Sequence, residues 1–472
     1  MQGVAAVALG AGLAQTAAAQ NVFAGPNTTG AAARDEDDTM AAPGQDSVAP
    51  IVPEPLRSWN GARSQLDDAG VSFAFTYLSD LMGTPGGGRK GASYMGRVEG
   101  VMDVDLAKAA GWRGATFHVG GFWIHGVGLS RHFIGNSSPV SDLEAAATAR
   151  LNDIWIEQTF GSFAAVRIGR LAADSEFFFY TPSASLPIGG AFGWAPIMGQ
   201  NLPNGGPAYP FAWPGARLQV RPFDHVLLQV GVFDGDAIGQ GADDPSWRDS
   251  VGVRARRAPP FVIGEARVAY RLPFLGGVTG QARIGGWRHF GAFDDQRYDW
   301  TGDLLAAPNS DGIAARRRGD YGVYGALDQH VWRPADDPKK GVFVWSRIGI
   351  APPGRNVIDL YLDGGVNVVG LTPGRPGDRF GLAASFSRAS AGARAHDRDT
   401  AFFYGPQRPA RDYEAILQAT YSVAIAPGVA VQPNVQYIFH PGGTGGAYFP
   451  DIFGIRKPER ALAFGVRTSI KY

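Results

Sequence analysis

The chain has no cysteine among its 472 residues, which excludes disulfides, a thiolate nucleophile and Cys-ligated zinc or iron–sulfur sites. Lysine is also scarce, because six lysines leave nearly all positive charge to arginine. Acidic and basic residues balance at 43 each and no basic block stands out, so nucleic-acid binding is not expected. Only one long uncharged segment, at the N-terminus, is able to enter a bilayer as a helix.

That segment, residues 3–20, is rich in small residues and offers an A-x-A cleavage site at 17–19, which predicts a signal peptide over 1–20. No Lys or Arg precedes it, so either the natural start lies upstream or the chain is trimmed. Residues 21–57 are rich in Pro, Ala, Asp and Gly without periodicity and predict a flexible periplasmic segment. Residues 58–472 then form one exported domain, which is soluble, secreted or a β-barrel.

The final stretch, RALAFGVRTSIKY, alternates with a period of two. Leu462, Phe464, Val466, Ile470 and Tyr472 fall on one side, while the other side holds charged and small residues. This pattern predicts a β-strand between two different environments. The apolar side would face a core in a soluble sandwich. In an outer-membrane barrel it would face lipid, with the terminal Tyr in the interfacial aromatic girdle.

Similar alternation recurs along the chain, and charged residues occupy one face of many predicted strands. Unpaired charges are costly in a packed core, whereas a water-filled lumen tolerates them. Sixteen strands are predicted, near 71–81, 94–106, 115–127, 152–160, 163–171, 215–222, 226–234, 264–272, 278–290, 320–333, 341–350, 357–370, 379–389, 411–425, 428–440 and 460–472.

The connections alternate between short and long in the same order. They are mostly short after even-numbered strands, as at 161–162 and 426–427, and mostly long after odd-numbered ones, as at 172–214. The gap at 351–356 is the exception. Short turns on one side and long loops on the other are typical of outer-membrane barrels. We therefore predict an all-β, 16-stranded antiparallel transmembrane β-barrel in the bacterial outer membrane, wide enough for an aqueous channel.

The chain also resembles the carbohydrate-selective porins of the OprB type, from about residue 58 to its end. The resemblance is densest in DIWIEQTFGSFAAVRIGRLAADSEFF and resumes in LPNGGPAYPFAWPGARLQVRP and LYLDGGVNVVGLTPGRPGDRFGLAASFS. It implies an outer-membrane channel that admits monosaccharides such as glucose through a constriction of charged and aromatic side chains. The aromatic terminus, Tyr472, is similar to the signal by which outer-membrane proteins reach their assembly machinery.

A sugar presents hydroxyl groups around its ring edge and C–H groups on its faces, so a selective site needs polar forks and a flat aromatic group. We expect the Trp155–Glu157 and Arg97–Glu99 pairs to be the best candidates, because each sets an aromatic or basic group two residues from a carboxylate. The alternative is that most lumen residues form polar ladders along the wall, which keep the lumen hydrated without contacting the sugar. The predicted constriction residues are Arg97, Glu99, Asp103, Trp155, Glu157, Arg167, Arg267, Arg283, Trp287 and Glu414.

The connection at 172–214 is long enough to fold inward, and its aromatic residues are unlikely to remain in water. They either contact the sugar or form a hydrophobic lid against neighbouring loops. The aromatic residues in question are Phe177, Phe178, Phe179, Tyr180, Phe192 and Trp194, with Pro182 and Pro187 stiffening the loop.

Other chemistry is weakly indicated. His118 and His125 have opposite strand parity, so no metal site is expected, and no cofactor is predicted. GVGLS at 126–130 lacks the central Ser of a nucleophile elbow, so an enzyme is not expected. Three hypotheses remain: a passive sugar-selective porin, a general diffusion porin of the same fold, and a barrel adhesin or outer-membrane enzyme. The expected partners are monosaccharides, outer-membrane lipid and the assembly machinery; homo-oligomerisation stays open.

Overall fold

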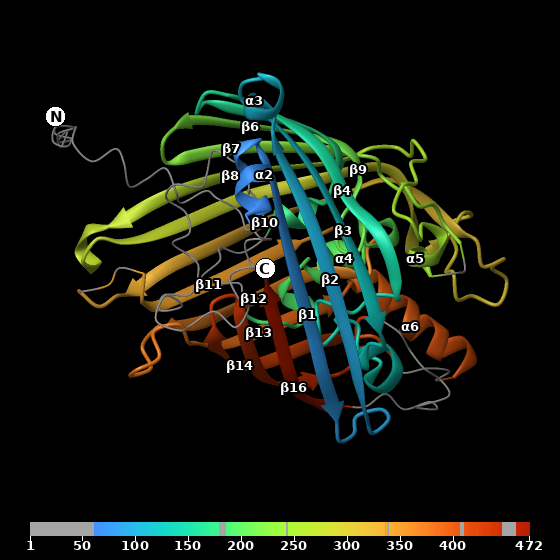
Figure 1. Cartoon of the computed structure of the whole chain (residues 1–472). Helices are drawn as coiled ribbons and strands as arrows, with labels where there is room; N and C mark the ends of the chain where they lie inside the picture. The colour runs from blue at the N-terminus through green and yellow to red at the C-terminus, as the bar shows by residue number, and fades with distance from the viewer. Residues whose placement is uncertain are drawn as a thin grey trace, which may run out of the picture.

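The computed structural model describes residues 61–178, 186–241, 244–335, 337, 339–405, 410–445 and 459–472. They form a closed barrel in which each strand pairs antiparallel with the next along the chain, and β1 pairs with β16 (Figure 1). The strands are β1 Val71–Thr84, β2 Gly91–Asp105, β3 Ala115–Gly126, β4 Thr148–Phe160, β5 Ala164–Leu171, β6 Trp213–Phe223, β7 Val226–Phe233, β8 Phe261–Leu272, β9 Val278–Asp299, β10 Ala314–Trp332, β11 Gly341–Ile350, β12 Ile358–Val369, β13 Arg379–Ala389, β14 Tyr413–Ala426, β15 Val429–Phe439 and β16 Arg460–Lys471.

The 16-stranded antiparallel barrel confirms the predicted fold class, and all sixteen predicted strands are present in the predicted order. The expected signal peptide at 1–20 and periplasmic segment at 21–57 lie outside the described residues. The described part of the chain begins beside the barrel, with helix α2, Ala62–Asp68, leading directly into β1.

The largest difference from the predicted boundaries is in β9 and β10, which extend to Asp299 and back to Ala314 instead of stopping near 290 and 320. The pairing of β9 with its neighbour β8 ends at His289, opposite Phe261. The pairing of β10 with its neighbour β11 ends at Val323, opposite Ile350. Beyond them the two strands pair only with each other. One face of this extension still buries Phe293, Asp295 and Asp299, but two of these three are acidic, so the residues there show no apolar alternation for the sequence pattern to detect.

Strand β16 has the alternation predicted for it. Ala461 and Ala463 are buried inside the barrel, whereas Phe464, Val466 and Ile470 are exposed on its outer wall. Large apolar side chains are exposed on the outside of many other strands too, among them Ile168, Ile284 and Leu382. An apolar outer band around a polar interior is the arrangement of a transmembrane β-barrel.

The connections separate by length as predicted. After even-numbered strands they are mostly short, as at 161–163 and 224–225, while the six-residue connection 85–90 and the seven-residue connection 351–357 are exceptions on the other side. No helix in the described residues has the length and apolarity needed to cross a membrane. The remaining helices and helical turns are α3 Leu106–Ala110, η5 Ser130–Ile134, η6 Ala173–Ser175, η7 Gly190–Phe192, α4 Pro196–Gly199, η8 Pro203–Gly205, α5 Pro245–Arg248, η9 Pro273–Leu275 and α6 Ala391–Tyr404.

Tyr472 contributes to barrel closure. Its backbone N–H donates to Phe75 at 2.8 Å, and its carbonyl oxygen accepts from the Phe75 N–H at 3.0 Å. Deleting Tyr472 removes both hydrogen bonds, each worth about 1 kcal/mol, and the aromatic ring. We expect less heat-modifiable barrel in outer-membrane fractions on electrophoresis. Tyr472→Phe, which retains backbone and ring, should assemble normally, and wild-type levels of the deletion variant would contradict this role.

Candidate channel constriction

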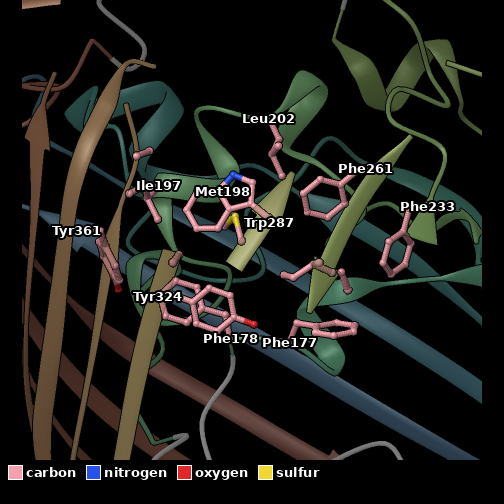
Figure 2. Packing of buried hydrophobic residues seen from close by; sticks show 14 of the residues in the cluster. Phe177, Phe178, Ile197, Met198, Leu202, Phe233, Phe261, Trp287, Tyr324 and Tyr361 are labelled. Atoms are coloured by element: carbon pink, nitrogen blue, oxygen red, sulfur yellow. The ribbon is translucent and has the colours of Figure 1, made fainter. Parts of the chain in front are cut away.

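The connection between β5 and β6 folds into the barrel (Figure 2). The ring of Phe178 stacks on Tyr324 of β10 with centroids 4.2 Å apart. This confirms inward folding for the described part of the loop; Phe179, Tyr180 and Pro182 lie outside it. The cluster joins loop residues Phe177, Phe178, Ile197, Met198 and Leu202 to wall residues Phe233, Phe261, Trp287, Tyr324 and Tyr361.

A fully buried arginine fastens this loop to the wall. Arg347 of β11 forms an ion pair with Asp363 of β12 at 2.8 Å, and both side chains are inaccessible to water. Its guanidinium also donates to the carbonyl oxygens of Phe178 at 2.6 Å and Gly193 at 2.9 Å. Buried carbonyls need donors, and a charged donor makes the stronger hydrogen bond. Arg347 therefore positions the loop.

A second connection, 127–147 between β3 and β4, also folds inward, and the sequence analysis did not identify it. Glu414 of β14 accepts hydrogen bonds at 2.7 Å from the backbone N–H groups of Ser137, Ser138 and Gly442. Gln436 of β15 donates to the carbonyl oxygen of Val140 at 2.6 Å. Glu414 is buried by these contacts. It lines the interior as predicted, but the structure gives it the role of a loop anchor.

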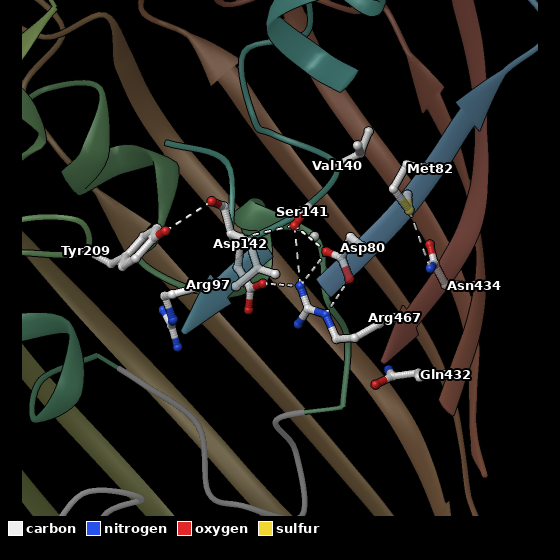
Figure 3. A network of polar contacts seen from close by, with 12 residues as sticks. Asp80, Met82, Arg97, Val140, Ser141, Asp142, Tyr209, Gln432, Asn434 and Arg467 are labelled. Carbon is white, nitrogen blue, oxygen red and sulfur yellow. Dashed lines mark hydrogen bonds and ion pairs between the residues drawn. The ribbon is translucent and has the colours of Figure 1, made fainter. Parts of the chain in front are cut away.

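An ionic network joins the same loop to the closing strands (Figure 3). Arg467 of β16 forms two hydrogen bonds of 2.8 Å with the carboxylate of Asp80 on β1. It also pairs with Asp142 of the loop, and Ser141 donates to Asp80 at 2.5 Å. The Asp142 side chain keeps 43% of its surface exposed. The network places an accessible carboxylate on the β16–β1 side of the lumen, and none of its members was predicted.

Two carboxylates and two arginines interlock on the wall formed by β4, β5 and β6. Glu157 accepts from Arg167 at 2.9 Å and from Arg217 at 2.7 Å. Glu176, from the inward loop, accepts from the same two arginines at 2.8 Å and 2.5 Å. Burial alone would raise the pKa of Glu176, but Arg167 and Arg217 outweigh it and hold that pKa below its ordinary value. Neither Glu176 nor Arg217 was predicted, because Glu176 belongs to no strand and the carboxylate partners of Arg217 come from β4 and from the inward loop.

Arg97 and Glu99 of β2 form the predicted pair, with 2.9 Å between nitrogen and oxygen. The Arg97 guanidinium also lies over the rings of Tyr209, 5.0 Å from its centroid, and Phe122, at 5.4 Å. Burial raises the pKa of Tyr209, so its hydroxyl stays protonated and donates to the carbonyl oxygen of Leu143 at 3.0 Å. Tyr209 is half-buried and thus supplies an aromatic group beside the Arg97–Glu99 pair.

Trp155 lies on the interior face of β4, the same face as Glu157 two residues away, as predicted. Its side chain is only 5% exposed. His118 of β3 stacks on it with centroids 4.6 Å apart, and the Arg167 guanidinium of β5 lies 3.7 Å from its centroid. These neighbours come from the strands on either side, so both ring faces are covered. The expectation that Trp155 covers a face of the sugar is wrong in this geometry, because no open face remains.

The other predicted residues line the interior but are buried. The Asp103 carboxylate lies 2.6 Å from Nδ1 of His118, the residue that stacks on Trp155. Arg267 pairs with Glu265 at 2.5 Å, and Arg283 with Asp328 at 3.5 Å. Trp287 belongs to the apolar cluster of the inward loop. These residues support the wall and the loop, so the alternative that most lumen residues are structural describes them better.

Around the candidate residues water reaches a limited set of charged groups, in addition to Asp142 of the β3–β4 loop. The side chains of Glu99, Asp153, Glu157 and Glu176 are between 14% and 26% exposed, and that of Arg97 is 17% exposed. The accessible charge is therefore mainly negative, with arginine donors beside it. Such a surface can accept hydrogen bonds from a polyol and donate hydrogen bonds to it. The described residues include no group of three His, Asp or Glu arranged for a metal ion.

Comparison with known proteins agrees with this architecture. The model of the carbohydrate-selective porin family, OprB, matches residues 89–472. The chain belongs to this family. Porin B of Pseudomonas aeruginosa is 23% identical over 410 residues, which cover 82% of this chain and 87% of that protein. The protein is thus a porin of the bacterial outer membrane.

Two solved structures of Pseudomonas putida OprB share the porin fold. The high-pH structure has a TM-score of 0.77 at 21% identity, and the low-pH structure a TM-score of 0.53 at 16% identity. In each case the match covers 88% of this chain and 97% of the solved one.

Glu157 gives the sharpest test of the candidate site in this porin. Glu157→Gln preserves shape but removes one accessible charge, so ion preference should shift toward anions and glucose should block the ion current less. Both are measured by conductance and reversal potential in planar bilayers. Trp155→Phe is the matched control, because a buried ring should affect sugar block little. The interpretation is contradicted if Trp155→Phe abolishes sugar block while Glu157→Gln leaves block and selectivity unchanged.

The porin should also respond to pH through Asp174, in the inward loop. Burial raises the pKa of Asp174 to about 6, although the Tyr209 N–H at 2.8 Å and the charge of Arg97 oppose this shift. The carboxyl is neutral below that pH and negative above it. We therefore expect cation selectivity, measured as reversal potential, to increase from pH 5 to pH 7, and Asp174→Asn to reduce the increase.

Glu144 provides the control for this pH dependence. Burial raises its pKa to about 7, so it titrates in the same window, but it accepts from the Ser130 N–H in the other inward loop. If Glu144→Gln flattens the pH profile and Asp174→Asn does not, the assignment to Asp174 is incorrect.

Proposed function

We propose that this porin is a passive channel for monosaccharides such as glucose, with its selectivity set where the two inward loops narrow the lumen. The observation that supports this proposal most directly is the arrangement of Arg97, Glu99 and Tyr209. A guanidinium fork, a carboxylate and a half-buried aromatic ring lie together there, with water access. These are the three kinds of group that a sugar ring requires.

The second polar surface, formed by Glu157 and Glu176 between Arg167 and Arg217, would accept and donate to further ring hydroxyls. Because each arginine is shared between two carboxylates, the charges are already compensated, and their hydrogen bonds to a sugar would replace bonds to water. Binding at such a site stays weak. A channel benefits from this, because a millimolar site corresponds to about −4 kcal/mol and lets the sugar leave.

A general diffusion porin is the second candidate, and one observation favours it. Trp155 and Trp287, the two indole rings predicted to contact sugar, are both buried. Tyr209 is then the aromatic contact, and it is itself partly buried. We propose no enzymatic activity, because the family is one of channels. Delivery by the assembly machinery remains a prediction.

Liposome swelling separates the two candidates. We expect glucose to enter porin-containing liposomes faster than a disaccharide, and much faster than a trisaccharide, because the inward loops narrow the passage. Replacing Tyr209 by Ala should reduce the preference for glucose over a non-sugar polyol of similar size, whereas Tyr209→Phe should preserve most of it. Similar swelling rates for mono- and trisaccharides would favour the general porin.

A further inference from the structure

The outer wall of the barrel changes from apolar to basic along the β9–β10 hairpin. Ile284 and Val323 are exposed on the outside, and Arg288 and Arg318 are exposed farther along the same face. The pairing sets Arg288 opposite Tyr321. The hairpin runs toward the side of the long connections, which is the extracellular side of such barrels. These arginines therefore lie where the apolar band ends, at the outer membrane surface.

Three arginines converge around Gly319, where the β9–β10 register shifts. Arg355, from the β11–β12 connection, donates to the carbonyl oxygens of Gly319 at 2.6 Å and Arg318 at 3.2 Å. The Arg288 guanidinium also lies beside Gly319. A Cβ atom added to Gly319 would be 2.8 Å from Arg288 Nη2. The guanidiniums of Arg288 and Arg355 lie over the Tyr321 ring, 5.5 Å and 5.6 Å from its centroid.

This outward charge is not neutralised by nearby carboxylates. Among the residues that the structure describes, no ion pair is formed by Arg288, Arg318 or Arg355. The two arginines that precede Arg318 on β10 do form ion pairs. Arg316 pairs with Asp294, and Arg317 pairs with Asp295 at 2.6 Å. Asp320 also acts on Arg355, but it is fully buried and accepts from Asn356 at 2.7 Å. The three guanidiniums thus present positive charge to the membrane surface.

We propose that Arg288, Arg318 and Arg355 bind the phosphorylated head group of the glycolipid of the outer leaflet, lipid A. Guanidinium forks match phosphate oxygens, and arginines at a membrane surface attract anionic head groups. Tyr321 and Phe290, which both lie against Arg288, are aromatic residues at the level where such rings mark a membrane interface. The site lies outside the lumen, so this proposal is independent of the one about sugar.

The test measures binding of bisphosphorylated lipid A to the purified full-length porin in detergent, by native mass spectrometry. Replacing all three arginines by Gln should weaken binding roughly a hundredfold, because each basic residue at an anionic surface contributes about fivefold. Single Arg288→Gln or Arg318→Gln variants should each weaken it about fivefold. The matched control is Arg271→Gln, which removes an exposed arginine at the end of β8 on the short-turn side and should leave binding unchanged.

Different ligands distinguish the source of the phosphate. Dephosphorylated lipid A should bind wild type and triple variant equally weakly. The proposal is overturned if phosphatidylglycerol binds the wild type as tightly as lipid A, if inorganic phosphate displaces lipid A at equal concentration, or if Arg271→Gln weakens binding as much as Arg288→Gln. Glucose conductance verifies that each variant is folded, and if the triple variant fails to assemble, the single variants decide.

Discussion

Every backbone N–H and C=O group at membrane depth has to find its partner within the protein, and the pairing of β1 with β16 completes that requirement. Once the sheet is closed, each strand residue points either to lipid or to the lumen. Apolar residues such as Phe464 and Ile284 then occupy the outside, and charged residues such as Arg467 and Glu157 the inside. The polar interior is therefore a consequence of closure, and both inward loops depend on it for anchors.

The loops are held by buried ionic groups that bind backbone atoms. Arg347 donates to loop carbonyls while paired with Asp363, and Glu414 accepts three loop N–H groups. Burying an ion is costly, so these groups are tolerable only because their hydrogen bonds are satisfied. The β5–β6 loop also adds an apolar cluster against Trp287 and Tyr324, and the β3–β4 loop contributes Leu129, Ile134 and Val140 to a second cluster that includes Trp345. Charge and apolar packing together hold two long segments inside a lumen that would otherwise be open to water.

The barrel was predictable because strand parity and loop length are local features of the sequence. Parity also placed Trp155, Glu157, Arg97 and Glu99 correctly on the inner face. It could not show which inner residues remain accessible, because that depends on neighbours across strands and on loops. Trp155 is covered by His118 and Arg167, whose contacts follow from register, and Glu414 by a loop that lies 276 residues away in sequence. Tyr209 and Glu176 were missed for the same reason, since both belong to a connection without periodicity.

Burial of the two tryptophans changes where selectivity can arise. A covered indole cannot stack on a passing sugar, but it can fix the groups beside it: Trp155 supports the Arg167 guanidinium at 3.7 Å, and Arg167 in turn orients Glu157 and Glu176. Preorganised hydrogen-bonding groups lose less conformational entropy on binding than mobile ones. In this arrangement Trp155, which was predicted to touch the sugar, instead supports polar groups of the proposed site, and Tyr209 is left as the aromatic contact of that site.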